Sequence, residues 1–256
     1  MGRAKEIIVK VIPSRIANEF VKKHHYSGKV VNNSQLHFGA FLDGKLHGVL
    51  QYGPSMDKSK TMRLVDGTAW SEFIELNRMA FDDYLPRNSE SYCIGKTIRL
   101  IKKHAPQIKW VISFADGAQC GDGTIYRASN FVLTGIKANQ SIYLFPSGDR
   151  IAKMTITANW DSPIMAKQAK FLNVPPGYRT IADWEKLGAK PIPGFQLRYV
   201  YFIDKRCRAR LTVPELPFSE IDRLGAGMYK GERIEQATRH AIKSERQKTK
   251  NTEKTD

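Results

Sequence analysis

The chain has 256 residues, of which 41% are hydrophobic, and carries a formal net charge of +16 at pH 7. This length is enough to bury a large core, and the basic excess favours an anionic partner, most often nucleic acid, over a merely lysine-rich soluble surface. No run approaches the roughly 18 apolar residues of a membrane span, and the first residues are too charged for a signal peptide. Three widely spaced cysteines without a CxxC pair are typical of a protein in a reducing cytoplasm.

Strands and helices alternate in the first part of the chain. The apolar run of residues 5–12 predicts a strand, and Ser14 is placed to cap a helix over residues 15–25. Residues 35–53 alternate in hydrophobicity around an Asp-Gly pair, which is the strongest hairpin signal in the chain. The sequence therefore predicts a strand, a helix and a hairpin in succession.

Polar residues interrupt the next predicted strand, FIELNRMAF at residues 73–81. In a regular strand Glu75 and Asn77 share one face, while Arg78 shares the other face with Leu76. Polar groups within an apolar run are costly unless they are paired. Without further context, an edge strand with one solvated face explains them best.

A helix over residues 90–106 and a strand over residues 109–116 complete a βαβ-like unit. A short helix is expected within residues 123–131, and further strands within residues 141–146 and 150–160. This order predicts an α/β fold of the GNAT-like acyltransferase type with a mixed central sheet. In that fold the helix after the central strands carries a pyrophosphate-binding loop at its N-terminus, where free backbone N–H groups favour anions.

The composition of the chain changes near Asp161. We expect a GNAT-like catalytic domain over residues 4–160 and a C-terminal extension over residues 161–227 that packs on it and contributes DNA contacts. A charged tail over residues 228–256 is expected to stay outside the core. The extension contains a strand-like run at residues 195–204, followed by the basic cluster KRCRARL.

Candidate catalytic residues lie at the ends of these elements. His25 and Tyr26 are either a helix-dipole partner with a core aromatic, or a general base or ligand beside a phenol. Asp116 ends a strand, where α/β proteins tend to bind ligands, and Tyr126 follows on the next helix. A carboxylate there is placed to accept a proton and a phenol to act as a general acid, while an Asx-turn and a core tyrosine explain the pair equally well.

The start of the helix over residues 90–106 offers several donors to a phosphate or carboxylate. They are Arg87, Asn88, Ser89 and Ser91. Ser89 alone is also explained as an ordinary N-cap, and capping is compatible with anion binding.

Histidines raise the question of a metal. His37 and His47 flank the hairpin at a spacing that allows proximity across the strands, but the sequence has no compact ligand motif such as HExxH. A loosely held iron with nitrogen and carboxylate ligands stays open, and its ligands are unknown.

Four segments together resemble the Mom family of Mu-like phages. They are HHYSGKVV, LHFGAFLDGKLHGVLQYG, ELNRMAFDDYLPRNSESYCIGKTIRLIKKHAP and WVISFADGAQCGDGTIYRASNFVLTG, and the resemblance covers residues 4–160. It implies a GNAT-like transferase that converts adenine in DNA to its carbamoylmethyl derivative at the exocyclic amine and so protects phage DNA from restriction. We therefore expect a DNA-modification enzyme of the host cytoplasm.

The resemblance also implies roles for single residues. The catalytic set is Asp116, Tyr126, His25 and Tyr26, and the donor-binding set is Arg78 and Ser91 with the neighbouring Arg87, Asn88 and Ser89. Asp116 is expected to orient or deprotonate the adenine amine. Tyr126 is expected to protonate the leaving group or to position the donor.

The acyl donor stays open between two compounds. The family resemblance implies acetyl-CoA and iron, but the segment RNSESYCIG lacks the glycines of an ordinary GNAT pyrophosphate loop. Glycyl-tRNA is the second donor. A glycyl group on the adenine amine carries a free amine that can attack the ring carbon through a five-membered intermediate and expel the amide, which gives carbamoylmethyl adenine without an oxidation.

Double-stranded DNA is the expected substrate, with tRNA as a further partner if it supplies the donor. An adenine amine is poorly accessible inside the stack, so we expect extrusion of the base. The expected phosphate contacts are Lys22, Lys23, Lys29, Arg206, Arg208 and Arg210, although a solvated basic face explains the arginines equally well. Two other functions stay open, namely a conventional GNAT N-acetyltransferase acting on a small molecule or protein, and a non-catalytic DNA-binding protein.

Overall fold

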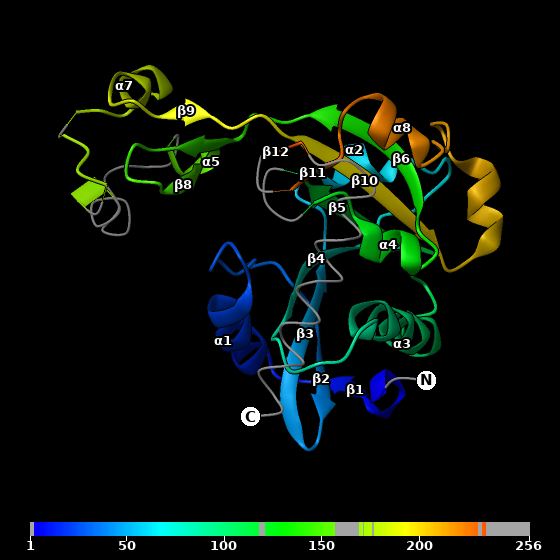
Figure 1. Cartoon of the computed structure of the whole chain (residues 1–256). Coiled ribbons are helices and arrows are strands. Elements are labelled where there is room, and N and C mark those ends of the chain that lie inside the picture. Colours follow the sequence, from blue (N-terminus) through cyan, green and yellow to red (C-terminus); the bar gives the residue numbers. More distant parts are fainter. Residues whose placement is uncertain are drawn as a thin grey trace.

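A computed structural model describes residues 3–117, 121–156, 169–170, 172–175, 177–229 and 232–233. Its centre is a seven-stranded sheet with the strand order β1-β2-β3-β4-β5-β10-β6 (Figure 1). β4 and β5 are parallel, and the other neighbouring strands of this sheet are antiparallel. The predicted α/β fold class with a mixed central sheet is confirmed.

The predicted elements of the first half occur in the predicted order, but a 3-10 helix replaces the start of the strand expected over residues 5–12, and the short helix at Lys58–Met62 was not predicted. After the 3-10 helix, η1 at Arg3–Glu6, the elements of this half are β1 Ile8–Val11, α1 Ser14–His24, β2 Leu36–Leu42, β3 Lys45–Gly53, α2 Lys58–Met62, β4 Phe73–Phe81, α3 Ser89–His104, β5 Trp110–Asp116 and α4 Thr124–Ala128. The later elements are β6 Val132–Ala138, β7 Ile142–Leu144, β8 Arg150–Ala152, α5 Lys153–Ile156, α7 Ile181–Lys186, β9 Lys190–Pro191, β10 Phe195–Phe202, the 3-10 helix η2 Lys205–Arg210, α8 Ser219–Arg223, β11 Met228–Tyr229 and β12 Glu232–Arg233. No helix in the described ranges combines the length and apolar character needed to cross a membrane.

α1 and α3 cover opposite faces of the central sheet (Figure 1). α1 packs Phe20 and Val21 against Val49 of β3 and Ala80 of β4. On the other face, the buried isoleucines of α3 pack against β3, β4 and β5. The two faces are called the α1 face and the α3 face below.

α1 and α3 each begin at the serine that was expected to cap them, so the N-cap is the residue before that serine. α1 begins at Ser14 itself, and its N-cap is Pro13, which makes no side-chain cap hydrogen bond. α3 begins at Ser89, and its N-cap is Asn88, whose φ of 68° is left-handed. Asparagine tolerates this conformation better than most residues, and the Ser89 hydroxyl instead donates to Pro86 O at 2.5 Å. The predicted N-caps at Ser14 and Ser89 are therefore wrong.

The segment after β6 departs most from the sequence-based expectation. The strand expected over residues 150–160 ends at Ala152, because Lys153–Ile156 form α5, and residues 157–160 lie outside the described ranges. β7, β8 and β9 form a separate three-stranded sheet. β10 then returns to the central sheet and pairs with both β5 and β6. The domain boundary at residue 160 and most of the tail over residues 228–256 also lie outside the described ranges, so this division stays a prediction.

β4 contains a β-bulge at Asn77. Gln51 of β3 pairs with Arg78, whereas the next residue, Tyr52, pairs with Leu76, so Asn77 is the extra residue of β4. An extra residue shifts the alternation of side chains between the two faces of a strand. The bulge therefore decides where the polar side chains of β4 point.

The side chains after the bulge change face. Leu76 and Met79 both pack in the cluster on the α3 face, although a regular strand would place them on opposite faces. Arg78 therefore points to the α1 face, which Glu75 also faces. The prediction that Arg78 shares a face with Leu76 is wrong, because it assumed a regular strand.

Gly53→Ala is expected to disturb the bulge. An added Cβ would lie 2.6 Å from Asn33 O and 2.9 Å from Asn77 Nδ2, and the first of these is a backbone atom. Overpacking of this kind costs about 1–3 kcal/mol, so we expect urea denaturation to show a loss of that size in the free energy of unfolding. Gly95→Ala is the control, since its nearest contact is 3.8 Å away at the Arg99 side chain; equal losses in the two variants would contradict the steric argument.

Candidate active site

β4 and β5 separate after a short parallel pairing. Phe73–Glu75 pair with Trp110–Ile112, and Ser113 Oγ then donates to Leu76 O at 2.9 Å. Beyond this point β4 continues along β3 and β5 continues along β10. The two strands thus diverge toward their C-terminal ends, and the predicted site residues lie around this divergence.

His25 follows α1 and is held in one orientation. Ser27 N–H donates to His25 Nδ1 at 3.2 Å, so Nδ1 is unprotonated and the neutral ring carries its hydrogen on Nε2. Burial lowers the pKa of His25 to about 4, and the positive charge of Arg78 contributes to this shift. The ring is therefore neutral at pH 7 and offers Nε2–H as a hydrogen-bond donor.

Arg78 joins this group from β4. Its Nε donates to Lys29 O at 3.1 Å and its Nη1 to Asn77 O at 2.7 Å, while Nη2 has no hydrogen-bond partner within the described ranges. Burial lowers the pKa of Arg78 and the nearby Tyr26 raises it. The Tyr26 ring is 57% exposed and lies 4.1 Å from that of His25, measured between centroids. The structure thus brings His25, Tyr26 and Arg78 together on the α1 face.

Two further polar groups beside Arg78 were not among the predicted site residues. Burial raises the pKa of Glu75, against the opposing effects of a hydrogen bond with Ser55 and the charge of Arg78. Asn77 Oδ1 accepts a hydrogen bond from Ser34 at 2.9 Å, whereas its Nδ2 is buried without a partner among the described residues. A carboxyl with a raised pKa beside an unpaired donor is typical of a functional site. The signal in the sequence was the run of polar residues in an apolar strand.

Asp116 lies at the end of β5. Asn139 Nδ2 donates to Asp116 Oδ2 at 3.2 Å, and Gly121 N–H donates to Asp116 O at 3.3 Å. Ala115 packs on the α3 face, so the alternation of side chains turns Asp116 toward the opposite face. The carboxylate is thus on the same face of the sheet as Arg78.

Tyr126 approaches the end of β5 from the α3 face. Its ring centroid lies 5.2 Å from that of Tyr199 and 5.5 Å from that of Phe131. Burial raises the pKa of Tyr52 and the nearby Tyr126 contributes, which places the two phenols close together. Tyr52 in turn lies 2.6 Å from the Thr97 hydroxyl of α3. Asp116 and Tyr126 therefore flank the end of β5 from opposite faces of the sheet.

The N-terminus of α3 presents only part of the predicted donor set. Ser89 is buried with its hydroxyl bound to Pro86 O, and Ser91 Oγ donates to Asn88 O at 3.1 Å. Arg87 and Asn88 are exposed. Ser89 N–H also donates to Pro86 O at 3.3 Å, so Ser89 holds the loop through its hydroxyl and its backbone. The N–H groups of Glu90 and Ser91 and the exposed Arg87 favour an anion here.

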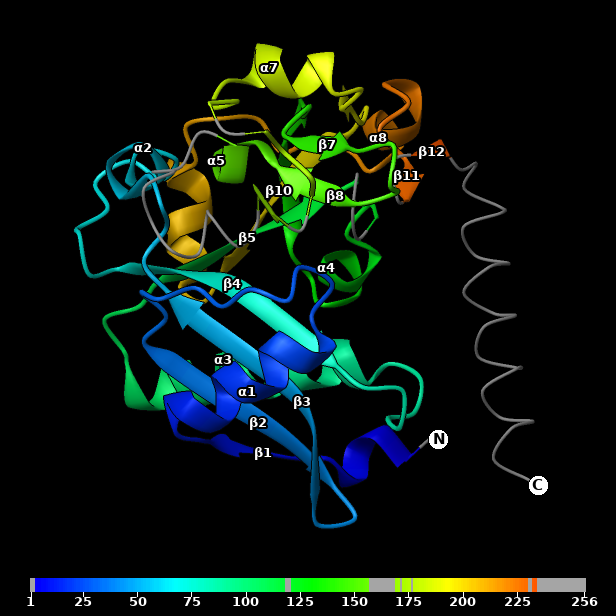
Figure 2. The same ribbon diagram turned by 90° about the vertical axis from the view of Figure 1, so that its left-hand side faces the viewer.

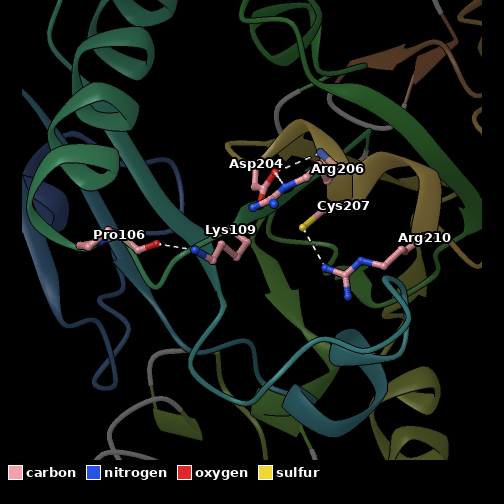
Figure 3. A network of polar contacts seen from close by, with 6 residues as sticks. All are labelled: Pro106, Lys109, Asp204, Arg206, Cys207 and Arg210. Carbon is pink, nitrogen blue, oxygen red and sulfur yellow. Dashed lines mark hydrogen bonds and ion pairs between the residues drawn. The ribbon is translucent and has the colours of Figure 1, made fainter.

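The basic cluster KRCRAR forms η2, and its arginines are bound within the protein. Arg206 pairs with Asp204 at 2.8 Å (Figure 3). The hydrogen bonds from Arg206 lower the pKa of Asp204 to about 2. In the same figure, Lys109 Nζ donates to Pro106 O at 2.9 Å.

The other two arginines of η2 are also engaged. Arg208 pairs with Glu215 at 2.6 Å. Arg210 donates to Asp66 O at 2.6 Å and to the buried free thiol of Cys207 at 3.1 Å. The side chains of Arg206 and Arg208 nevertheless stay 88% and 56% exposed, and the predicted contact of the three arginines with phosphate stays a prediction.

The three lysines predicted to contact DNA lie on or after α1. Lys22, Lys23 and Lys29 are exposed, and Lys29 Nζ donates to Thr155 Oγ1 of α5 at 3.1 Å. They therefore lie on the α1 face with His25 and Arg78, and their contact with phosphate stays a prediction.

The histidines of the hairpin do not meet. His37 pairs with Gln51 in the register of β2 and β3, and His47 Nδ1 instead lies 2.7 Å from Asp82 Oδ2. Within the described part of the chain, no group of three or more His, Cys, Asp or Glu side chains is placed to hold a metal ion. The expected proximity of His37 and His47 is not observed, and the described residues do not fit an iron site.

Comparison with known proteins identifies the family. The model of the Mom protein family matches residues 6–220. The chain belongs to the Mom family. This Mom-family protein is 33% identical over 210 residues to the methylcarbamoylase mom of Escherichia phage Mu, an alignment that covers 82% of this chain and 80% of that protein.

Solved structures similar to this Mom-family protein are distant. The ribosomal-protein-S18-alanine N-acetyltransferase of Escherichia coli is 9% identical with a TM-score of 0.40, covering 77% of this chain and 94% of that one. The spermidine/spermine N-acetyltransferase of Vibrio cholerae is 8% identical with a TM-score of 0.44, covering 81% and 99%. Both concern the fold alone.

The low pKa of His25 predicts a stability that falls with acid. Because the folded pKa, about 4, lies below the ordinary 6.5, the unfolded chain takes up this proton first as the pH falls. The contribution is complete above about pH 6.5 and is lost progressively down to about pH 4. Between pH 7.5 and 4.5, urea denaturation should show the wild type losing on the order of 2 kcal/mol more than His25→Gln. Equal losses in the two proteins, or an NMR titration midpoint near 6.5, would refute the assignment.

Proposed function

We propose that this Mom-family protein converts adenine in double-stranded phage DNA to its carbamoylmethyl derivative at the exocyclic amine. The modified DNA would resist host restriction, and the protein would act in the host cytoplasm. The observation that carries the proposal is that polar residues implied by the family resemblance gather around the divergence of β4 and β5, in a chain that belongs to the family over residues 6–220. The name of the phage Mu relative, a methylcarbamoylase, supports the same chemistry.

The geometry suggests a role for each side chain. Asp116 orients or deprotonates the adenine amine from one face of the sheet, and Tyr126 protonates the leaving group or positions the donor from the other. His25 and Tyr26 line the reaction centre, with His25 as a neutral hydrogen-bond donor. Arg78 Nη2, which has no hydrogen-bond partner among the described residues, is available for the carbonyl or a phosphate of the donor.

Glu75 is a second candidate for the proton acceptor. It lies on the same face as Arg78, and burial raises the pKa of its carboxyl. A base whose pKa is raised toward the working pH removes a proton more effectively than an ordinary carboxylate. In this arrangement Asp116 would orient the amine and Glu75 would receive its proton.

The N-terminus of α3, with Ser91 and Arg87, would hold the anionic part of the donor. Acetyl-CoA and glycyl-tRNA both present phosphates, but the product contains one nitrogen more than adenine, and an acetyl group brings no nitrogen whereas a glycyl group brings one. Glycyl transfer forms a bond between the adenine nitrogen and the glycyl carbon and releases the tRNA hydroxyl. The glycyl amine then bonds to the ring carbon, and the original bond from that carbon to nitrogen breaks. Every atom of the product is accounted for without an oxidant, which favours glycyl-tRNA.

Nucleoside mass spectrometry tests the reaction. DNA from bacteria that express the wild type should contain carbamoylmethyl adenine, and Asp116→Asn or Tyr126→Phe should each lower its amount by about 100-fold or more, as expected for loss of acid–base catalysis. Asp66→Asn is the control, because that side chain is exposed and outside the site. Finding only unmodified adenine with the wild type would refute the proposed function. Full activity of Asp116→Asn would refute the assignment of the site.

Isotope labelling tests the donor. Purified protein with duplex DNA and glycyl-tRNA carrying ¹⁵N-glycine should give labelled product, and fragmentation should locate the label on the nitrogen bonded to the ring. The amide nitrogen should be the unlabelled nitrogen of the original adenine. Product formed from acetyl-CoA alone, or label found in the amide, would contradict the glycyl route.

A further inference from the structure

The loop between β3 and β4 exposes two large apolar side chains that the proposed chemistry does not use. Met56 is 77% exposed and Trp70 is 56% exposed. Lys58 Nζ lies 4.3 Å from the centroid of the Trp70 ring. Met56, Lys58 and Trp70 are called the loop platform below. An exposed aromatic ring beside a cation, on a loop that also exposes an aliphatic side chain, is typical of a binding surface.

The turn that carries Trp70 is anchored on both sides. Ala69 N–H donates to Glu72 Oε2 at 2.9 Å. The fully buried Trp110 donates its Nε1–H to Thr68 Oγ1 at 3.2 Å. These two bonds order the turn from which the exposed indole projects, and an ordered turn lowers the entropy cost of binding through it.

The loop platform adjoins the candidate active site. Lys58 Nζ lies 5.7 Å from the centroid of Phe73, whose cluster is on the face opposite α3. Ser55, the residue before Met56, lies close enough to Glu75 to oppose the rise of its pKa. Figure 2 shows α2 and its loop at the end of the sheet where β4 begins. The loop platform thus lies on the same face of the sheet as the site, toward the start of β4 and on the side of Glu75 away from Asp116.

Charge and chemistry select DNA as the occupant. The chain carries a net charge of +16, and the last turn of α1 adds the exposed Lys22 and Lys23 to this face. Apolar and aromatic side chains enter duplex DNA where bases are unstacked, and an indole with a cation over one face can stack a base on the other. Extrusion of the target adenine would create such an opening.

We propose that Trp70 stacks in the gap that the extruded adenine leaves in duplex DNA, with Lys58 holding the indole in orientation. The inference rests on the proposed function, because only a base that leaves the stack creates this gap. In this arrangement the loop platform stabilises the DNA from which the target adenine has been extruded. The chemistry itself stays with the residues around β4 and β5.

Binding to an abasic duplex tests the loop platform independently of catalysis. An abasic site reproduces the stack after a base has left, so the full-length wild type should bind a duplex with one abasic site about tenfold or more tightly than the intact duplex at the same salt concentration. Trp70→Ala should abolish this preference, and Trp70→Phe should retain most of it. Phe218→Ala is the matched control, since Phe218 is 37% exposed and also has a cation, Arg127, over its ring.

Modification rates separate the failure of this inference from the failure of the proposed function. Trp70→Ala should lower the rate of adenine modification in duplex DNA by about tenfold or more. Its rate on a single-stranded oligonucleotide of the same sequence should stay within about twofold of the wild type, since a single strand needs no extrusion. Equal losses on both substrates, or a wild type without abasic preference, would overturn the role of Trp70. A wild type that prefers the abasic duplex but modifies no adenine would refute the proposed function while the loop platform stands.

Discussion

Inside a regular sheet, neighbouring strands leave no room for a ligand, because backbone hydrogen bonds hold them about 5 Å apart. β4 and β5 depart from this rule after three paired residues each. The separation costs little free energy because each strand keeps a hydrogen-bonded partner on its outer side, β3 for β4 and β10 for β5. The bond from Ser113 to Leu76 O links them one residue beyond that pairing. Everything placed around the site depends on where these two strands part.

The electrostatics of the α1 face follow from the same geometry. Burial lowers the pKa of His25 and raises the pKa of Glu75, so desolvation favours the neutral form of both groups. Arg78 remains charged, since a guanidinium does not deprotonate in proteins. The positive charge of Arg78 therefore lies near His25 and Glu75, whose neutral forms burial favours. An anionic or developing negative charge on the donor would find its counter-charge in Arg78.

Local signals in the sequence predicted the elements whose structure is decided locally. The Asp-Gly turn is an example, because Asp43 and Gly44 both adopt the positive φ that the hairpin requires, 50° and 75°. The βαβ unit was predictable for the same reason, because it depends on residue types at short spacings. The cluster of His25, Tyr26 and Arg78 joins distant parts of the chain, and only the family resemblance indicated it.

Features that depend on distant partners were not predictable. The bulge at Asn77 follows from the pairing of β4 with β3, and without it the face of Arg78 was misassigned. The run KRCRAR does not reveal that Arg210 donates to Asp66 O, a residue 144 positions away, and the contact of these arginines with phosphate stays a prediction. The sequence of a basic run does not show whether its side chains bind phosphate or acceptors within the protein.

β10 lies between β5 and β6, although it is the last of the three along the chain and starts at Phe195, whereas β6 ends at Ala138. A nascent chain leaves the ribosome N-terminus first. β5 and β6 are therefore translated before β10, the strand that pairs with both of them. The outer support of β5, and with it the end of the strand that carries Asp116, is complete only once Phe202 has emerged. Products of interrupted translation would therefore lack the assembled site, and an enzyme that alters the bases of DNA would act only from a chain translated beyond that point.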